Sequence, residues 1–430
     1  MSEKLSDDFK AYPYWWEGTS QQQETEPAPL PAKADVVIVG AGLTGTTAAH
    51  TLALAGRDVL ILDAGRPGSG ASSRNGGMLG RYFKHSFGQM KDSAGLDTAI
   101  AYFRELCTVY DFAVDRIRDH GLDAGFRDCG RVVGAVTQAH KERLFREWEL
   151  RARHIGEAVE FLDGDSPELS TSRYVAGIRI VENSSVHPGL YADATIDLAR
   201  RAGARIIGET PVLGLERTGN GFRVATARGT VETRDVVVAT NGYTSPKLGW
   251  FHKRLSPIEA FMVATEPLSD GAITRIRDLR STYHDNRKNS NYYQISEDGR
   301  LVFGGRTGLH HSSVRQMAMK LHEEMLYFFP ELEGTRITHA WNGRCAATED
   351  LFPHVGTHNG VHFAIGYCFS GNAMAPYLGH KAAMRLLGDR DGAHTLFTQD
   401  ALRLVPWPKR QTWLIPIAMQ YFRWKEPLPR

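Results

Sequence analysis

Apolar residues near the amino terminus follow a pattern that predicts a strand, a helix and a second strand. Residues 36–39 are continuously apolar, which is typical of a central strand buried on both faces of a parallel sheet. A glycine-rich turn follows, and the small residues 46–49 begin the expected helix. Residues 59–62 form the second apolar run. Two parallel strands joined by a helix are therefore expected between residues 34 and 65.

Further along the chain, apolar spacing predicts helices and additional strands. Residues 92–121 carry apolar side chains at helical spacing, and residues 234–246 combine a buried strand with a glycine turn. The stretches 130–138 and 259–268 have strand-like patterns. Small residues follow Gly371, so a helix is expected to begin there and to end at Gly388.

Composition indicates an ordinary globular protein with small-molecule partners. The chain has 430 residues, 42% hydrophobic and 23% charged, which is enough for two or three domains with sizeable cores. Its 51 Lys and Arg residues nearly balance 49 Asp and Glu residues, so no nucleic-acid partner is expected. The four cysteines have neither pair spacing nor neighbouring histidine clusters, so no disulfide framework and no metal site are expected.

The two ends of the sequence bear on cellular location. Residues 1–10 are polar and lack the apolar core of a secretory signal. No stretch reaches the roughly 20 apolar residues that span a bilayer. A cytoplasmic protein is expected, and membrane association is not. Residues 407–424 mix aromatic and basic side chains and have two interpretations, an interfacial helix or a tail packed against the body.

The glycine-rich turn carries a nucleotide-binding pattern. Gly40, Gly42 and Gly45 fit G-x-G-x-x-G, in which the first glycine permits a tight turn, the second allows a pyrophosphate to touch the backbone, and the third allows close helix–strand packing. Asp63 ends the second strand 21 residues after Gly42, where an acid accepts hydrogen bonds from a ribose hydroxyl. The combination predicts a dinucleotide site, and a glycine turn in an unrelated unit is the alternative.

Several segments in a fixed order carry a resemblance to a flavoprotein family. The second strand is followed by the serine- and glycine-rich loop 63–80 and the long helix, not by another strand–helix repeat. The later segments are 186–216, 234–246, 284–306, 341–356 and 364–383. Their order and spacing resemble the FAD-dependent D-amino-acid oxidase (DAO) superfamily. Residues 70–77, GASSRNGG, look most like its γ-glutamylputrescine oxidoreductase branch, near the glycine and sarcosine oxidases.

The resemblance implies an α/β fold with two domains. One is an FAD-binding, Rossmann-like domain of the glutathione-reductase type, comprising residues 34–110, 187–249 and 340–392. The other is a substrate domain with a mixed, largely antiparallel β-sheet and helices, comprising residues 111–186 and 250–339. Residues 1–33 would form an irregular arm whose aromatic side chains lie over the body, and residues 393–430 a carboxy-terminal tail.

The residues expected to contact FAD come from several segments. Ser72 and Ser73 would donate hydrogen bonds to the diphosphate, and amides around Gly76 would lie against the isoalloxazine edge. Arg74 would either neutralise phosphate or flavin charge or point to solvent. The amides that begin the helix at Gly371 would favour negative charge on reduced flavin. The expected FAD-binding residues are Gly40, Gly42, Thr44, Gly45, Asp63, Ala64, Ser72, Ser73, Arg74, Asn75, Gly76, Gly77, Met78, Val212, Thr240, Asn241, Gly242, Cys345, Gly371, Asn372, Ala373 and Met374.

Two positions depart from the family pattern. Cys345 stands where related proteins often have an arginine that holds a substrate carboxylate, and Ala375 stands where sarcosine oxidases have a lysine with the same role. The substrate is therefore not expected to be a simple α-amino acid, and an amine, or an anionic group bound farther out, is favoured. Cys345 has two interpretations, a covalent thioether to the flavin or a buried apolar cysteine.

The substrate pocket has candidates but no assigned catalytic residue. They are His85, Tyr293, Arg306 and Trp341, with Arg81 as a further basic candidate. Each basic side chain has an alternative as a solvated surface charge, and each aromatic side chain has one as part of the core.

The resemblance also implies a reaction. An FAD-dependent oxidoreductase of this kind would oxidise a C–N bond of a secondary amine, a polyamine conjugate or an amino-acid derivative. Hydride would pass from the carbon beside an unprotonated nitrogen to flavin N5, and water would hydrolyse the resulting imine to a carbonyl product. Oxygen or another acceptor would take the electrons, with an oxidase favoured over a dehydrogenase. The alternatives are a D-amino-acid dehydrogenase that passes electrons to a quinone or carrier, and an NAD(P)H-dependent flavin monooxygenase.

Overall fold

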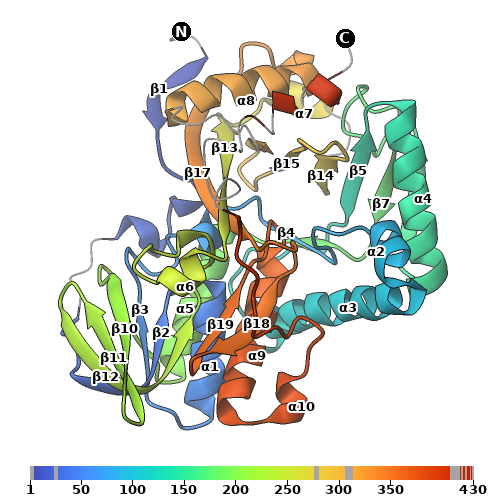
Figure 1. The fold of residues 1–430 in the computed structure, drawn as a ribbon. Helices are drawn as coiled ribbons and strands as arrows, with labels where there is room; N and C mark the ends of the chain where they lie inside the picture. Colours follow the sequence, from blue (N-terminus) through green and yellow to red (C-terminus); the bar gives the residue numbers. More distant parts are fainter. Residues whose placement is uncertain are drawn as a thin grey trace.

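Two large sheets organise the part of the chain that the structure describes (Figure 1). This computed structural model describes residues 4–23, 28–275, 280–305 and 313–406, and beyond them only positions 417, 420, 421, 424–426 and 428. One sheet has eight strands and the other nine. A short two-stranded sheet joins β4 (Met78–Leu79) to β8 (Ser184–Ser185). The expected mixed α/β fold is confirmed.

The eight-stranded sheet contains the predicted strand–helix–strand unit. Its order is β10-β11-β12-β2-β3-β9, with β19 beside β12 and β18 beside β19. The pairs β12–β2, β2–β3, β3–β9 and β12–β19 are parallel. The strands are β2 (Lys33–Val39), β3 (Val59–Leu62), β9 (Arg205–Ile207), β10 (Val212–Thr218), β11 (Gly221–Thr226), β12 (Gly229–Val238), β18 (His354–His358) and β19 (Val361–Ile365).

Both faces of this sheet are covered, which explains its continuous apolar runs. In β2, Val36 and Ile38 pack against the helices of one face, whereas Val37 and Val39 belong to a second core on the other face. A strand with both faces buried has no solvent side on which polar residues would alternate. The helices are α1 (Leu43–Leu54), α3 (Leu96–Asp119), α5 (Pro188–Arg201) and α9 (Gly371–Leu387) on the first face, and α6 (Gly249–His252) on the second.

The nine-stranded sheet has one face under a helix and the other toward the rest of the molecule. Its order is β1-β17-β13-β16-β15-β14-β5-β7-β6, in which only β1–β17 and β14–β5 are parallel pairs. Helix α8 (Val314–Phe328) packs on one face and runs along the top of Figure 1. The strands are β1 (Leu5–Lys10), β5 (Arg131–Ala135), β6 (Val159–Asp163), β7 (Ala176–Ile180), β13 (Ser256–Thr265), β14 (Thr282–Asp285), β15 (Asn291–Ile295), β16 (Leu301–Gly305) and β17 (Ile337–Ala347).

The other expected elements are found close to their predicted positions. Helix α3 occupies most of residues 92–121, and Gly95, with a φ of 91°, separates it from α2. Gly388 ends α9 in the left-handed conformation. The strand-like stretch 130–138 contains β5, and the stretch 259–268 overlaps β13, which begins three residues earlier. The remaining elements are α2 (Phe87–Ala94), α4 (Gln138–Ile155), α7 (Asp270–Arg275) and α10 (Arg390–Ala393), with short 3-10 turns η1 (Tyr14–Trp16), η2 (Ser20–Gln22), η3 (Ala71–Ser73), η4 (Asn241–Tyr243) and η5 (Pro330–Leu332).

Several expected domain limits fall inside continuous elements, most clearly in α3 and β17. Helix α3 runs through the limit between residues 110 and 111. Strand β17 begins before residue 340 and pairs with β13 along its length, so residues 340–347 belong to the nine-stranded sheet. The presence of two sheets supports a division into an FAD-binding and a substrate domain, which remains a proposal.

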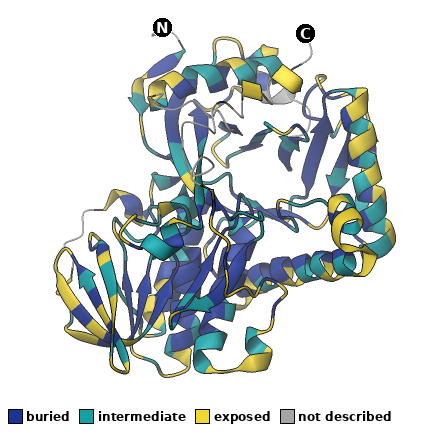
Figure 2. Cartoon of the chain, viewed as in Figure 1, coloured by how far each residue is buried: buried dark blue, intermediate teal, exposed yellow. Residues whose placement is uncertain are grey.

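The amino-terminal arm lies against the body. Strand β1 forms the edge of the nine-stranded sheet, and Trp15, only 2% exposed, packs with Met262 and Trp341. Figure 2 shows that the central strands are largely buried, whereas β10, β11 and β12 and the outer surfaces of the helices carry exposed residues. No helix in the described part of the chain combines the length and apolarity needed to cross a membrane. Arg306 and most of residues 407–424 lie outside the described residues.

Candidate active site

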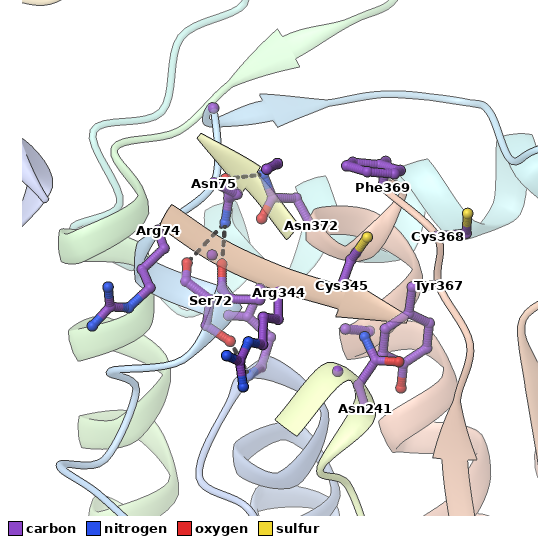
Figure 3. Close-up of a pocket in the computed structure, with 18 of the residues that line it drawn as sticks. Ser72, Arg74, Asn75, Asn241, Arg344, Cys345, Tyr367, Cys368, Phe369 and Asn372 are labelled. Carbon is purple, nitrogen blue, oxygen red and sulfur yellow. Dashed lines mark hydrogen bonds between the residues drawn. The ribbon is translucent and has the colours of Figure 1, made fainter. Parts of the chain in front are cut away.

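A cavity of about 980 Å³ extends from the carboxyl ends of β2 and β3 to the face of the nine-stranded sheet opposite α8. In open parallel sheets, ligands bind at the carboxyl ends of strands. We call the part lined by residues from the segments 39–44, 62–78, 211–213, 239–248, 343–345 and 367–375 the glycine-turn end, much of which appears in Figure 3. Not every residue of these segments reaches the cavity, and Ser73, Gly77, Ala373 and Met374 do not. The part lined by residues 81–86, 103, 131–151, 180–183, 260–262 and 284–292 is the sheet end.

The turn after β2 is shaped by close backbone approaches. Gly40 has a φ of 106°, and a Cβ on Gly45 would overlap with the Gly40 carbonyl oxygen. A Cβ on Gly42 would lie 2.8 Å from Ser72 Oγ. Gly40, Gly42 and Thr44 line the cavity, whereas Gly45 lies behind them at the contact between helix and strand. The amino end of α1 therefore faces the cavity, where its N–H groups suit an anionic group.

Asp63 lies in the cavity wall where β3 ends. Its carboxylate accepts hydrogen bonds from the N–H of Ala41 at 2.7 Å and from the N–H of Gly65 at 3.0 Å. Burial raises the pKa of Asp63, and these two backbone donors oppose the rise. The carboxylate oxygens can accept further hydrogen bonds, which suits a ribose hydroxyl.

Residues 65–78, which we call the cradle loop, fold over the glycine turn. The Leu43 N–H donates to Ser72 Oγ at 3.0 Å. Asn75 Nδ2 donates to two carbonyls of the same loop at 3.0 and 2.9 Å, and Asn75 Oδ1 accepts from the Gly77 N–H at 2.8 Å. Gly77 has a φ of 73°, a conformation that favours glycine. The loop is therefore fixed by its own hydrogen bonds.

The structure places Ser73 and Arg74 differently from part of the expectation. Ser73 is fully buried. Its Oγ accepts a hydrogen bond from Trp16 Nε1 at 2.9 Å and donates one to the Gly68 carbonyl at 2.7 Å. Its only hydroxyl proton is therefore used within the protein, and Ser73 does not line the cavity. Arg74 does line it. Its guanidinium lies 4.4 Å from the Trp16 ring centroid and donates to two backbone carbonyls at 2.6 and 3.1 Å.

Two asparagines join the cradle loop to α9. Asn372 Nδ2 donates to Asn75 Oδ1 at 2.9 Å and to the Met78 carbonyl at 3.0 Å, and Figure 3 shows the two side chains meeting. On the other side of the loop, Gln294 Nε2 donates to the Gly76 carbonyl at 2.7 Å. The segment from Asn75 to Met78 is therefore held from both the helix and the nine-stranded sheet.

Helix α9 begins at the cavity. Gly371 and Ala375 line the wall, and a Cβ on Gly371 would meet no atom within 4 Å. The Met374 N–H donates to the Ser370 carbonyl, so the N–H groups before it have no acceptor within the helix and can face an anion. Ala373 and Met374 were expected to contact FAD, but they turn into the helical core because they lie on the opposite side of α9.

The turn after β12 meets the end of β17. A Cβ on Gly242 would lie 2.6 Å from the Arg344 carbonyl oxygen, and Asn241 Oδ1 accepts from the Gly366 N–H at 2.9 Å. Cys345 is half-buried and lines the cavity beside this turn, so it does not lie in the apolar core. Ala64, Val212 and Thr240 also line the cavity.

Strand register decides which tyrosine reaches the cavity. Successive residues of β15 point to opposite faces, so Tyr292 lines the cavity and Tyr293 packs under α8. Tyr293 is 1% exposed, and its hydroxyl bonds to those of Ser170 at 2.7 Å and Tyr174 at 3.0 Å. The Tyr292 ring lies 3.0 Å from where a Cβ on Gly76 would be. The expectation that Tyr293 walls the pocket is therefore corrected to Tyr292.

Trp341 lies behind the cavity wall and not in it. It is 1% exposed, pairs with Met262 across β13 and β17, and packs with Trp15. Its Nε1 donates to the Arg74 carbonyl at 2.9 Å. Trp341 therefore supports the cradle loop, whereas Cys345, on the same face of β17 and four residues further on, reaches the cavity.

The expected basic residues differ in how far their charge is compensated. His85 lines the cavity, its ring lies 4.5 Å from that of Phe352, and its Nε2 bonds to a backbone carbonyl at 2.8 Å. Arg81 also lines the cavity but forms ion pairs with two carboxylates. Arg306 lies outside the described residues.

Sequence reasoning missed most of the sheet end and one support of the cradle loop. No spacing motif joins the sheet-end residues, because strands far apart in the chain bring them together. The aromatic triplet at residues 14–16 was the only sequence signal for the loop support, Trp16. The missed cavity residues include Tyr82, Arg131, Val133, Glu147, Trp148, Arg151, Met262, His284, Asp285, Arg287 and Tyr292.

The glycine-turn end fits FAD. The amino ends of α1 and α9 face the same cavity, Asp63 lies where a ribose would bind, and the open space at Gly371 leaves room for a flat ring. Among the residues that the structure describes, no group of His, Cys, Asp or Glu side chains is arranged to hold a metal ion.

Comparisons with known proteins agree with this fit. The family model described as FAD dependent oxidoreductase (DAO) matches residues 35–385. The chain is 28% identical over 388 residues to the probable oxidoreductase OrdL of Haemophilus influenzae, covering 87% of this chain and 88% of that protein. It is 28% identical over 361 residues to the gamma-glutamylputrescine oxidoreductase of Escherichia coli K12, covering 83% and 84%.

A solved structure shares the fold. The glycine oxidase from Geobacillus kaustophilus superposes with a TM-score of 0.69 at 24% identity, covering 85% of this chain and 97% of that chain. At this identity the likeness establishes the fold alone. The family model matches most of the sequence and therefore establishes the family as well as the fold. The chain belongs to the DAO family of FAD-dependent oxidoreductases, and FAD is its cofactor.

Proposed function

We propose that the protein oxidises a C–N bond of an amine to an imine, which hydrolyses to a carbonyl product. The observation that carries this proposal is the continuity of the cavity, because the glycine-turn end that fits FAD opens directly onto the sheet end. A cofactor and a small substrate can thus share one chamber. Two of the similar proteins are named for nitrogen compounds, glycine and gamma-glutamylputrescine, which supports an amine substrate.

The residues of the chain position and shield the reaction. Bound FAD supplies the hydride acceptor. The amino end of α9 stabilises negative charge that develops beside it, and the bonds from Asn372 and Gln294 fix the cradle loop at the same place. Tyr292 and Met262 cover this region from the nine-stranded sheet and exclude water from it.

The wall of the sheet end accommodates a neutral amine. Glu147 accepts hydrogen bonds from the N–H groups of Phe87 at 2.6 Å and Gly88 at 3.0 Å, and Asp285 holds Arg287 through two bonds of 2.8 and 2.9 Å. No other carboxylate lines the sheet end within the described residues. Backbone N–H groups thus engage both oxygens of Glu147, and Arg287 balances Asp285, so neither carboxylate is free of other partners. The neutral amine is the form that can release hydride.

The proposed substrate has no carboxylate on the reacting carbon. Cys345 and Ala375 both line the cavity, and neither can form an ion pair with a carboxylate. We therefore propose a secondary amine, a polyamine conjugate or an amino-acid derivative in place of a simple α-amino acid. We further propose that oxygen accepts the electrons and that the protein works in the cytoplasm.

An anaerobic reduction screen tests this function. Purified holoprotein is mixed without oxygen with secondary amines, polyamine conjugates and amino acids, and the visible flavin absorbance is followed. We expect at least one amine to bleach the flavin and oxygen to restore the colour. If no amine bleaches it while NADPH alone does, the protein is a monooxygenase and the proposal is wrong.

Cys345 has a separate test. Acid precipitation leaves the colour with the protein if a thioether links Cys345 to the flavin, and a Cys345→Ala variant then releases the colour. If the unaltered protein releases all of its flavin into the supernatant, the thioether is excluded.

A further inference from the structure

The sheet end of the cavity contains an arginine whose charge is not compensated. Arg131 is the first residue of β5, is 2% exposed and lines the cavity. Its guanidinium lies 4.7 Å from the Tyr82 ring centroid, and its Nε donates a long hydrogen bond of 3.4 Å to Thr282 Oγ1. Its Nη2 is buried and has no hydrogen-bond partner among the described residues.

The other arginines of the described cavity wall are compensated. Arg81, Arg151, Arg287 and Arg344 each form an ion pair with at least one carboxylate. Arg74, at the glycine-turn end, donates to two backbone carbonyls. Within the described residues, Arg131 therefore presents the uncompensated guanidinium of the sheet end.

A buried cation in this situation is costly to the folded protein. Removing a charged group from water costs several kcal/mol unless a partner supplies the lost interactions. The contact with the Tyr82 ring recovers only part of this, because cation–π attraction contributes about 1–2 kcal/mol. An anion that enters the cavity would supply the missing hydrogen bonds, and a carboxylate matches the planar guanidinium.

The position of β5 in the sheet indicates how far this anion lies from the cradle loop. Tyr292, which covers Gly76, is on β15, and the strand order places β14 between β15 and β5. Two strand spacings correspond to about 10 Å. Val133, Trp148 and Ile180 provide apolar wall between α4 and this part of the sheet. A linking chain of methylene groups would fit such a wall.

We propose that Arg131 binds a carboxylate of the substrate at a distance of several bonds from the reacting nitrogen. This inference rests on the proposed amine oxidation and adds the substrate class to it: an amine with an acidic group at the far end of an apolar chain. It also agrees with the neutral side chains of Cys345 and Ala375, which leave the reacting carbon without a carboxylate site.

Matched ligand pairs test the proposal. The probes are N-methyl ω-amino acids of increasing chain length and the N-methyl alkylamines of the same length, titrated anaerobically into the holoprotein. Affinity is measured by calorimetry, and KM and kcat are measured for any probe that is turned over. At the best length, we expect the amino acid to bind roughly 10- to 100-fold more tightly than the alkylamine.

Variants assign this preference to Arg131. Arg131→Gln should abolish the preference with little change in alkylamine affinity, and Arg131→Lys should keep part of it. The control is Arg179→Gln, because Arg179 lies in the adjoining strand β7, pairs with Glu160 and is outside the cavity wall. It should keep the full preference. FAD content and melting temperature are measured for every variant.

Each outcome decides the proposal. If the unaltered protein shows no carboxylate preference at any length, or if Arg131→Gln weakens both members of a pair equally, the proposal is wrong. Should Arg131→Gln fail to fold, Arg131→Lys and the unaltered protein still give this answer. If no probe reduces the flavin but a carboxylate preference depends on Arg131, the anion site is supported and the amine oxidation fails.

Discussion

The two ends of the cavity are built in different ways. At the glycine-turn end, backbone groups form most of the wall: helix N–H groups, close glycine contacts and a loop stabilised in part by its own hydrogen bonds. At the sheet end, side chains from β5, β14, β15 and α4 form the wall, and ion pairs balance the charges of Arg151 and Arg287 but not that of Arg131. Backbone-built sites tolerate few changes, whereas side-chain walls can change specificity without losing the fold.

The largest effect is expected from Gly77→Val in the cradle loop. Valine disfavours the φ of 73°, and its Cβ would overlap with the Val186 carbonyl oxygen. We expect the free energy of unfolding to fall by about 3 kcal/mol or more and the FAD to be lost. Chemical denaturation and the flavin absorbance per protein measure both effects.

The control separates backbone conformation from close contact. Gly121 also has a positive φ, 55°, but a Cβ there would meet no atom within 4 Å. Gly121→Val should therefore cost only about 1–2 kcal/mol and keep its FAD. Full FAD occupancy in Gly77→Val would contradict the expectation that FAD binding depends on the conformation of the cradle loop.

A smaller effect is expected from Asp63→Asn. The amide nitrogen would replace an oxygen that accepts from the N–H of Ala41 or Gly65, and the ribose would lose a charged acceptor. We expect the Kd for FAD to rise roughly 10- to 100-fold in fluorescence titrations of the apoprotein. Asp58→Asn is the control, because Asp58 precedes the same strand and pairs with Arg205 at the exposed surface. An equal change in both variants would contradict a ribose contact by Asp63.

The smallest effects test the sheet end through two adjacent tyrosines. Tyr292→Leu removes the ring over Gly76 and should lower kcat/KM for the amine roughly tenfold while FAD stays bound. Tyr293→Phe removes a hydroxyl that bonds to Ser170 and Tyr174. It should lower the free energy of unfolding by about 1 kcal/mol and leave kcat/KM within about twofold. If Tyr293→Phe lowered kcat/KM and Tyr292→Leu did not, the substrate would lie on the Tyr293 face of β15, which contradicts the assignment made above.

The same contrast explains how much could be predicted from the sequence. The turn at Gly40 and the acid at Asp63 belong to one strand–helix–strand unit, and the start of α9 is marked by Gly371 and the small residues that follow it, so a local pattern indicates each of them. The strand pattern of residues 291–295 did not reveal which tyrosine faces the cavity, because both are aromatic and a one-residue register change exchanges the faces. Arg131 gave no local signal, since β14 and α4 approach it only in the folded chain.

Ser73 and Trp341 failed as predictions for a related reason. Ser73 lies in the glycine-rich loop and Trp341 in the segment 341–356, which both resemble the family. Each side chain forms a hydrogen bond with a residue outside its own segment: Ser73 with Trp16, and Trp341 with the Arg74 carbonyl. A hydroxyl or an indole N–H in such a segment can serve either a ligand or the protein, and only the folded structure shows which.

The amino-terminal arm has a consequence for the order of events during synthesis. Its residues are synthesised before β17, but β1 pairs with β17 and Trp15 packs on Trp341, so the partners of the arm lie far along the chain. The arm therefore cannot dock until β17 has been synthesised. Because Trp16 bonds to Ser73 beneath the cradle loop, the loop reaches its final support only then.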